Sequence, residues 1–126
     1  MTSATALSAC LFCVCLCSSA EKGAAPVVAC NPKGISAAGR PRHRDLAQHL
    51  RSAIQRRAGI PDGYAYTLNG KNIALPEVAE WISLERLCCP FLTFRLSASG
   101  SQADWVLMIV GPHGVKPLLD AEFPGR

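Results

Sequence analysis

Residues 85–94, ERLCCPFLTF, place a proline where a helical pattern changes into a strand pattern. Proline has no amide N–H and disfavours a helical conformation in the residue before it, so the helix should end at Cys88 or Cys89. The residues after Pro90 are β-prone and predict a strand. Inside a regular helix, adjacent side chains diverge by about 100°. At a helix end, the two cysteines can instead turn towards one site.

The remaining pattern predicts an α+β domain. Apolar residues recur with the helical period at Leu46 and Leu50 and again at Val78 and Trp81, and β-prone runs lie between and after these segments. We expect helices over residues 41–57 and 76–88 and after Gly114, and strands over 64–68, 91–98 and 103–110. The order α-β-α-β-β-α corresponds to a single domain, in which three helices pack on a small, mainly antiparallel sheet.

The first 20 residues predict a secretory signal peptide. Residues 4–17 carry no charge, and this run is shorter than the ~20 apolar residues that span a bilayer. Two alternatives stay open. One is a lipoprotein box at residues 7–10, and the other is a soft-metal tag formed by Cys10, Cys13, Cys15 and Cys17.

A signal peptide divides the chain into three regions. After residues 1–20 we expect an irregular segment over residues 21–35, which is punctuated by Pro and Gly, and a cysteine-pair domain over residues 36–126. Cleavage would give an exported protein, periplasmic or secreted, with no stable membrane span. Without cleavage we expect a cytoplasmic protein.

Charge and cysteine count narrow the possible partners. The chain has 126 residues and a formal net charge of +4, which is too mild to indicate nucleic-acid binding. Removal of the signal would reduce seven cysteines to three, Cys30, Cys88 and Cys89. An odd number leaves at least one thiol unpaired or paired outside the chain.

Glu85 is the second unusual residue of the opening motif. It lies three residues before Cys88 and four before Cys89, within reach of both along a helix. It also falls on the apolar stripe, where a carboxyl group either finds a partner or becomes harder to ionise. The alternative is that Glu85 lies at the edge of the stripe and reaches water. We expect His43 and His49 to be surface residues.

The position of the cysteine pair argues against a catalytic nucleophile. A helix C-terminus and a neighbouring carboxylate both raise the pKa of a thiol, whereas reactive thiolates lie beside positive charge. We therefore assign no catalytic residue and leave enzymatic activity open. A bound soft cation would supply the missing charge and drive deprotonation.

Cys30 could add a third sulfur to the pair. Three thiolates suit a soft ion of low coordination number, such as Hg(II) or As(III), better than the tetrahedral site of structural zinc. Glu85 would then accept a hydrogen bond beside the cluster. A disulfide from Cys30 to Cys88 or to Cys89 is equally compatible with export, and a Cys88–Cys89 disulfide is the least favoured pairing.

The motif also resembles a known kind of domain. AEWISLERLCCPFLTFRLSASG, followed by WVLMIVGPHGVKPLLDAEF, is similar to a small cysteine-pair domain at the C-terminus of some MerR-family heavy-metal regulators and to standalone bacterial proteins. Ala29-Cys30, the Glu-x-x-Cys-Cys-Pro-Phe motif and Gly111-Pro112-His113-Gly114 carry the resemblance, which covers residues 28–123. It implies an association with metal or thiol stress. A winged-helix part is missing here, so we expect no role as a transcription factor.

Three hypotheses for the function follow. The first is a soft-metal or metalloid site formed by Cys30, Cys88 and Cys89, with a metal ion or a small thiol-reactive species as partner. It needs three clustered sulfurs near a surface opening. The second is a thiol–disulfide redox domain, which needs Cys30 within disulfide distance of the pair. The third is a structural or interaction domain with inert cysteines dispersed and sealed in the core.

Overall fold

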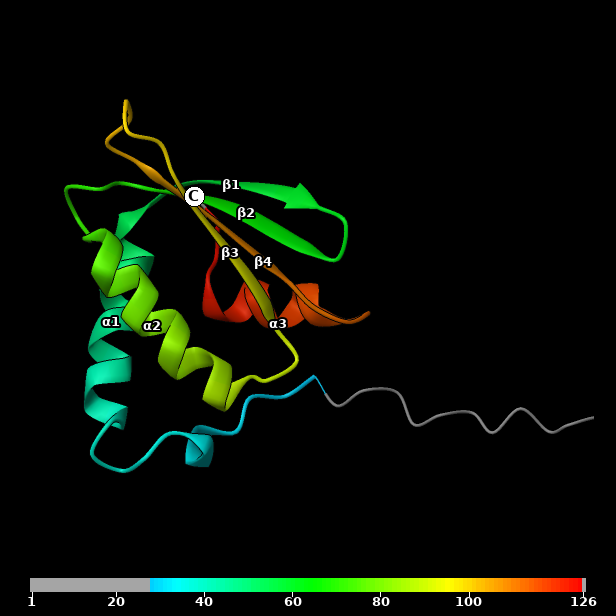
Figure 1. Ribbon diagram of the computed structural model, residues 1–126. Helices are drawn as coiled ribbons and strands as arrows, with labels where there is room; N and C mark the ends of the chain where they lie inside the picture. The colour runs from blue at the N-terminus through cyan, green and yellow to red at the C-terminus, as the bar shows by residue number, and fades with distance from the viewer. Residues whose placement is uncertain (1–27, 126) are drawn as a thin grey trace, which may run out of the picture.

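The sheet has four antiparallel strands in the order β1-β2-β4-β3, as seen in a computed structural model that describes residues 28–125 (Figure 1). The strands are β1 Ile54–Ile60, β2 Gly63–Leu68, β3 Thr93–Ala98 and β4 Trp105–Val110. The helices are α1 Arg40–Ala53, α2 Leu75–Cys88 and α3 Val115–Glu122, and a single 3₁₀ turn, η1, covers Pro32–Gly34. The predicted α+β class, with three helices on a mainly antiparallel sheet, is confirmed. The predicted signal peptide lies outside the described residues.

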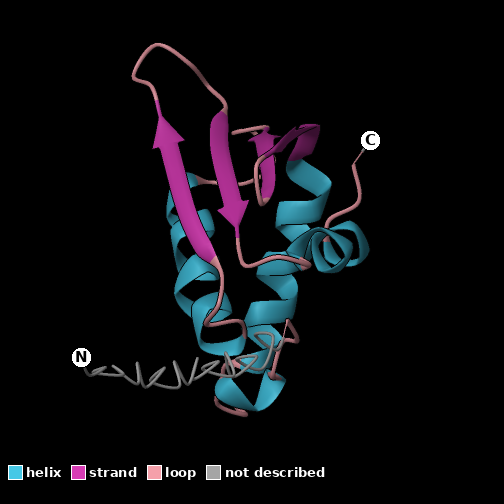
Figure 2. Cartoon of the chain, turned by 90° about the vertical axis from the view of Figure 1, so that its right-hand side faces the viewer, coloured by secondary structure: helices cyan, strands magenta, loops and turns pink. Residues whose placement is uncertain are grey.

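One face of the sheet forms the core, and the three helices cover it (Figure 2). The strands alternate as half-buried strands should, so that Tyr66 and Leu68 of β2 and Leu107 and Ile109 of β4 are buried. Trp81 of α2 lies at the centre, where its ring makes edge contacts with Phe94 and Phe123. Phe123, at the end of α3, also meets Tyr66, so the aromatic rings tie α2 and α3 to the sheet.

Strand β1 is a correction to the sequence analysis, which extended the first helix to residue 57. The helix ends at Ala53, and Ile54 is already extended. Ile54 continues the helical stripe and is buried as expected, but its backbone pairs with Leu68 of β2. The periodicity could not reveal this pairing because β2 follows later in the chain. Arg56 and Arg57 then lie on an edge strand, where charged residues discourage pairing with other chains.

Helix α2 begins one residue before its predicted start and ends at its predicted end. At its start, the Glu77 carboxylate accepts a hydrogen bond of 2.9 Å from the Ala74 amide. At its end, Cys89 leaves the helical conformation, with φ −124° and ψ 71°, just before Pro90. The Leu92 amide then donates to the Cys89 carbonyl across a tight turn and leads the chain into β3. The cysteine pair is therefore held at a helix-to-strand junction, as predicted.

Helices α1 and α2 lie antiparallel (Figure 1). Three polar side-chain pairs link them. Arg42 binds Glu80 through two hydrogen bonds of 2.9 and 2.7 Å, and His49 lies 3.3 Å from Glu77. The third pair, deeper in the interface, joins His43 to Glu85. Among residues 28–125, no helix has the length and apolar character that crossing a bilayer requires.

Candidate functional site

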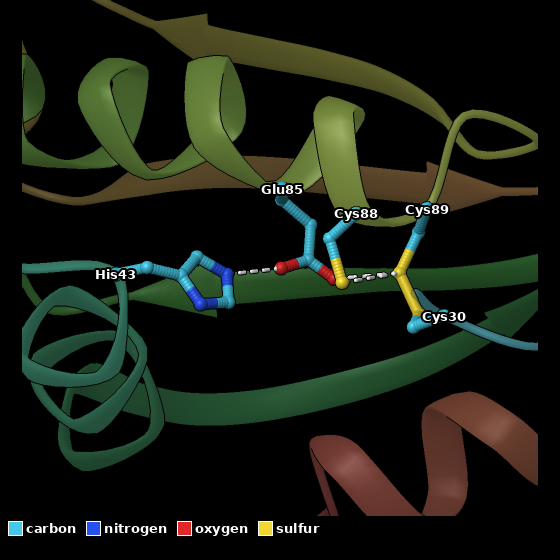
Figure 3. The surroundings of a disulfide bond; sticks show 5 residues. All are labelled: Cys30, His43, Glu85, Cys88 and Cys89. Atoms are coloured by element: carbon cyan, nitrogen blue, oxygen red, sulfur yellow. Dashed lines mark hydrogen bonds and ion pairs between the residues drawn. A yellow bond between two sulfur atoms is a disulfide. The ribbon is translucent and has the colours of Figure 1, made fainter. Parts of the chain in front are cut away.

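A disulfide joins Cys30 to Cys89 across 59 residues of sequence, with a Cα–Cα distance of 4.7 Å (Figure 3). Cys30 comes from the segment before α1, and Cys89 caps the C-terminus of α2. The sequence analysis left the partner of Cys30 open between Cys88 and Cys89, and the structure places the bond at Cys89. Cys89 is completely buried, whereas Cys30 is only partly buried.

The backbone around Cys30 is pressed against the end of α2. The Asn31 amide donates a 2.9 Å hydrogen bond to the carbonyl of Cys88, one of the carbonyls that a helix end leaves without an intrahelical partner. Gly34 lies so close to the helix that a Cβ there would fall 2.1 Å from the Leu87 carbonyl oxygen. Ile35 then anchors the segment in the core. These contacts, together with the disulfide, fix the position of Cys30.

Cys88 supplies a third sulfur and is the free cysteine within residues 28–125. Its Sγ lies 3.8 Å from that of Cys89, and the three sulfurs all lie within 4.8 Å of one another. Burial raises the pKa of the Cys88 thiol, and the charge of Glu85 raises it further. The direction of this shift agrees with the sequence-based expectation, although burial contributes more than the carboxylate. Cys88 is therefore a poor spontaneous nucleophile.

Glu85 is buried beside the sulfurs, with an exposed fraction of 6%. Its Oε1 lies 3.2 Å from the Sγ of Cys89, and a reduced Cys89 thiol could donate a hydrogen bond to this oxygen. Burial raises the pKa of the Glu85 carboxyl, and the neighbouring His43 opposes the shift without reversing it. The alternative of a solvated position at the edge of the stripe is wrong, because α1 covers the carboxyl group.

His43 is the residue of the site that the sequence analysis placed wrongly on the surface. Its Nε2 lies 2.5 Å from Oε2 of Glu85, and only 19% of its side chain is exposed. His49, by contrast, is 52% exposed, as expected. The signal for His43 was its spacing of three residues before Leu46, which puts it on the buried face of α1. His43, Glu85 and the sulfurs form a continuous row (Figure 3).

The row opens to solvent through a pocket of about 350 Å³. Cys30 and Cys88 line this pocket, whereas Cys89 does not reach it. The rest of the lining comes from the segment before α1, the first turn of α1, and the ends of α2 and α3. These residues are Pro32, Ile35, Arg40, His43, Arg44, Glu85 and Glu122.

The structure thus brings together Cys30, Cys88, Cys89 and Glu85, the residues that the sequence analysis selected from two distant segments. The sulfurs are clustered and not dispersed; Cys30 and Cys88 line the pocket, whereas Cys89 is sealed from solvent, with an exposed fraction of 0%. The three sulfurs cluster near an opening, as a metal site needs. Cys30 also has a partner at disulfide distance, as a redox site needs. Comparisons with family models, curated proteins and solved structures find no match to this chain.

Proposed function

We propose that the reduced protein binds a soft metal or metalloid ion, of the Hg(II) or As(III) type, through Cys30, Cys88 and Cys89. The observation that carries the proposal is the clustering of three sulfurs within 4.8 Å at a pocket. Three thiolates at about 2.3 Å from one ion lie roughly 3.5–4 Å apart. The 3.8 Å between the sulfurs of Cys88 and Cys89 already falls in this range.

The chemistry of the site favours a soft ion of low coordination number. Sulfur ligands select soft ions, and a fourth thiolate, which a structural zinc site would take, is missing among residues 28–125. The ion would also replace the protons of thiols whose surroundings disfavour ionisation, since metal binding drives deprotonation. Glu85 can accept one of these protons or a hydrogen bond at Cys89. The resemblance to the MerR-appended domain is part of the same proposal.

The disulfide makes the proposed binding dependent on redox state. In the oxidised chain, Cys30 and Cys89 are bonded to each other and cannot act as thiolates. Reduction frees both sulfurs, which then need to move apart by only about 1.5–2 Å to reach the spacing of metal ligands. The reduced form should therefore bind the ion, and the oxidised form should not.

The test is a titration of the full-length chain with arsenite and with Hg(II), followed by native mass spectrometry. Four cysteines of the first segment would bind the same ions, so the background carries Cys10→Ser, Cys13→Ser, Cys15→Ser and Cys17→Ser. We expect one As(III) per reduced chain and none per oxidised chain. Cys30→Ser, Cys88→Ser and Cys89→Ser should each weaken As(III) binding by more than about 100-fold, because each removes a direct ligand.

Hg(II) serves as a second readout because two thiolates can hold it. Each single variant should keep weaker Hg(II) binding, and Cys30→Ser combined with Cys89→Ser should lose it. Absence of uptake of both ions by the reduced, folded chain would contradict the proposal. Uptake that survives all three single variants unchanged would also contradict it, since the ion would then be held elsewhere.

A further inference from the structure

The two cysteines of the disulfide differ in their exposure to the pocket. Cys30 is partly exposed and lines the pocket, whereas Cys89 is completely buried behind it and contacts Glu85. A molecule entering the pocket therefore meets Cys30 and not Cys89. We propose that this pocket is a thiol–disulfide exchange site for a small anionic thiol, which opens the disulfide by attack at Cys30.

The exchange proceeds in two displacements. The thiolate of the small molecule forms a bond to Sγ of Cys30 while the Cys30–Cys89 bond breaks, and the bonding electron pair goes to Sγ of Cys89. Each departing cysteine sulfur takes up one of the two protons that the small thiols release when they ionise, and the Cys89 thiol can then donate a hydrogen bond to Glu85 across their 3.2 Å contact. A second small thiolate then attacks the small-molecule sulfur of the mixed disulfide, and Cys30 leaves as a thiolate. Two small thiols are oxidised to one disulfide, and the protein disulfide is reduced to two thiols.

Cys88 does not compete as the attacking group. Its thiol lies 3.8 Å from the Cys89 sulfur, but attack there would create a disulfide between adjacent residues, which is strained. Cys88 is also buried, with an exposed fraction of 5%, and burial makes a thiol harder to ionise. An external thiol is therefore the reductant that the arrangement calls for. Once the disulfide is open, Cys88 completes the set of three thiols on which the proposed metal binding rests.

The charges around the pocket favour an anionic thiol. Two guanidinium groups, those of Arg40 and Arg44, line it, against the single carboxylate of Glu122. The remaining charged side chains, His43 and Glu85, are paired with each other and add little net charge. The Arg40 side chain is held in place by a 3.2 Å hydrogen bond to the Pro32 carbonyl. Within residues 28–125, Arg44 forms no ion pair, so it is available to a ligand.

The test measures how fast three thiols of different charge open the disulfide of the oxidised full-length chain, in the four-serine background and without metal. Glutathione is the anionic probe, 2-mercaptoethanol the neutral one and cysteamine the cationic one. Second-order rates are expressed per thiolate, because the thiols differ in pKa. The measured quantity is the ratio of the glutathione rate to the cysteamine rate. This ratio should fall about threefold or more in Arg40→Gln/Arg44→Gln, and also at 1 M salt, where exposed charges are screened.

A matched double variant controls for net charge. Arg51→Gln/Arg56→Gln removes two exposed arginines that do not line the pocket and should leave the ratio of rates unchanged. Rapid acid quenching and peptide mapping should find the glutathione mixed disulfide on Cys30. A ratio that is the same in both double variants, or a mixed disulfide on Cys89, would overturn the inference.

The outcome is separable from that of the metal titration. Fast, charge-selective exchange together with a reduced chain that takes up neither ion would leave this inference standing and defeat the proposed function. The reverse result, metal uptake after reduction by a neutral reagent but no preference for an anionic thiol, would defeat only the inference. Thermal unfolding of each variant verifies that it is folded before its rate is interpreted.

Discussion

His43 and Glu85 are 42 residues apart in the chain and meet between α1 and α2, with Nε2 of His43 2.5 Å from Oε2 of Glu85. This contact gives a buried carboxyl group its polar partner on one side, while the Cys89 sulfur lies on the other. It also connects the thiol cluster to the interface of the two helices. The stability of the fold and the chemistry of the sulfurs are therefore linked through one side chain.

Removal of the buried His43 imidazole should destabilise the protein more than removal of the exposed His49 imidazole. His43→Ala leaves the Glu85 carboxyl buried without this partner, and we expect the free energy of unfolding to fall by about 1–3 kcal/mol. His49→Ala, which breaks the exposed contact with Glu77, should cost less than about 0.5 kcal/mol. Urea denaturation of the oxidised chain measures both values. Equal, small effects of the two substitutions would show that the buried pair contributes no more than the surface pair.

Ionisation of Glu85 should contribute to the pH dependence of the unfolding free energy. Its pKa in the folded protein is raised from the usual 4.5, chiefly by burial, so the folded state keeps a proton that the unfolded chain releases. The resulting stabilisation is fully present below pH 4.5 and is lost as the pH rises through the raised pKa. The difference in unfolding free energy between wild type and Glu85→Gln should therefore decrease with rising pH.

Glu80 provides a control of opposite sign for this titration. Its hydrogen bonds with Arg42 lower the pKa of the carboxyl, so its stabilisation is present above 4.5 and is lost as the pH falls. The difference between wild type and Glu80→Gln should increase with rising pH. Denaturation curves collected from about pH 2 to 8 measure both differences, since the Glu80 transition lies at and below 4.5. If the difference in unfolding free energy between wild type and Glu85→Gln also increased with rising pH, as for Glu80→Gln, the raised pKa of Glu85 would be refuted.

The close approach of η1 to α2 should make Gly34 intolerant of a side chain. A Cβ at this position would lie 2.1 Å from the Leu87 carbonyl oxygen, so the segment that holds Cys30 would have to move. We expect Gly34→Ala to lower the unfolding free energy by about 1–3 kcal/mol, as overpacking does, and to make the disulfide easier to reduce. Gly100→Ala is the control, because nothing lies within 4 Å of its Cβ. Thermal unfolding and equilibration in a glutathione buffer measure the two effects.

The disulfide should be a stabilising link that the fold can survive without. Its two cysteines are separated by 59 residues, and loop-closure entropy for such a loop gives an upper value of about 4 kcal/mol. Reduction should lower the unfolding free energy by about 2–4 kcal/mol and leave the helical circular dichroism signal intact, because the aromatic core remains. Cys30→Ala/Cys89→Ala should be insensitive to reductant. A reduced chain without helical signal would mean that the thiol cluster cannot exist in folded form.

Local signals in the sequence were sufficient for most of the secondary structure and for the choice of site residues. Pro90 ends α2, and it disfavours a helical conformation at Cys89, whose φ of −124° and ψ of 71° are non-helical. The apolar stripe of α2 marked Glu85 as a carboxyl group in an unusual place. Strand β1 was missed because Ile54 satisfies the helical period equally well, and only pairing with β2 decides its conformation.

The sequence by itself determined that two cysteines and a carboxyl group would meet at the end of α2, because residues three and four apart on a helix are neighbours whatever the rest of the chain does. The tertiary structure alone decided that Cys30 bonds to Cys89, that His43 lies against Glu85, and that the cluster opens into a pocket lined by two arginines. These relationships join residues 42 or 59 positions apart. They depend on how α1 and η1 pack against α2, and side-chain packing over such distances leaves no periodic signal in a single sequence.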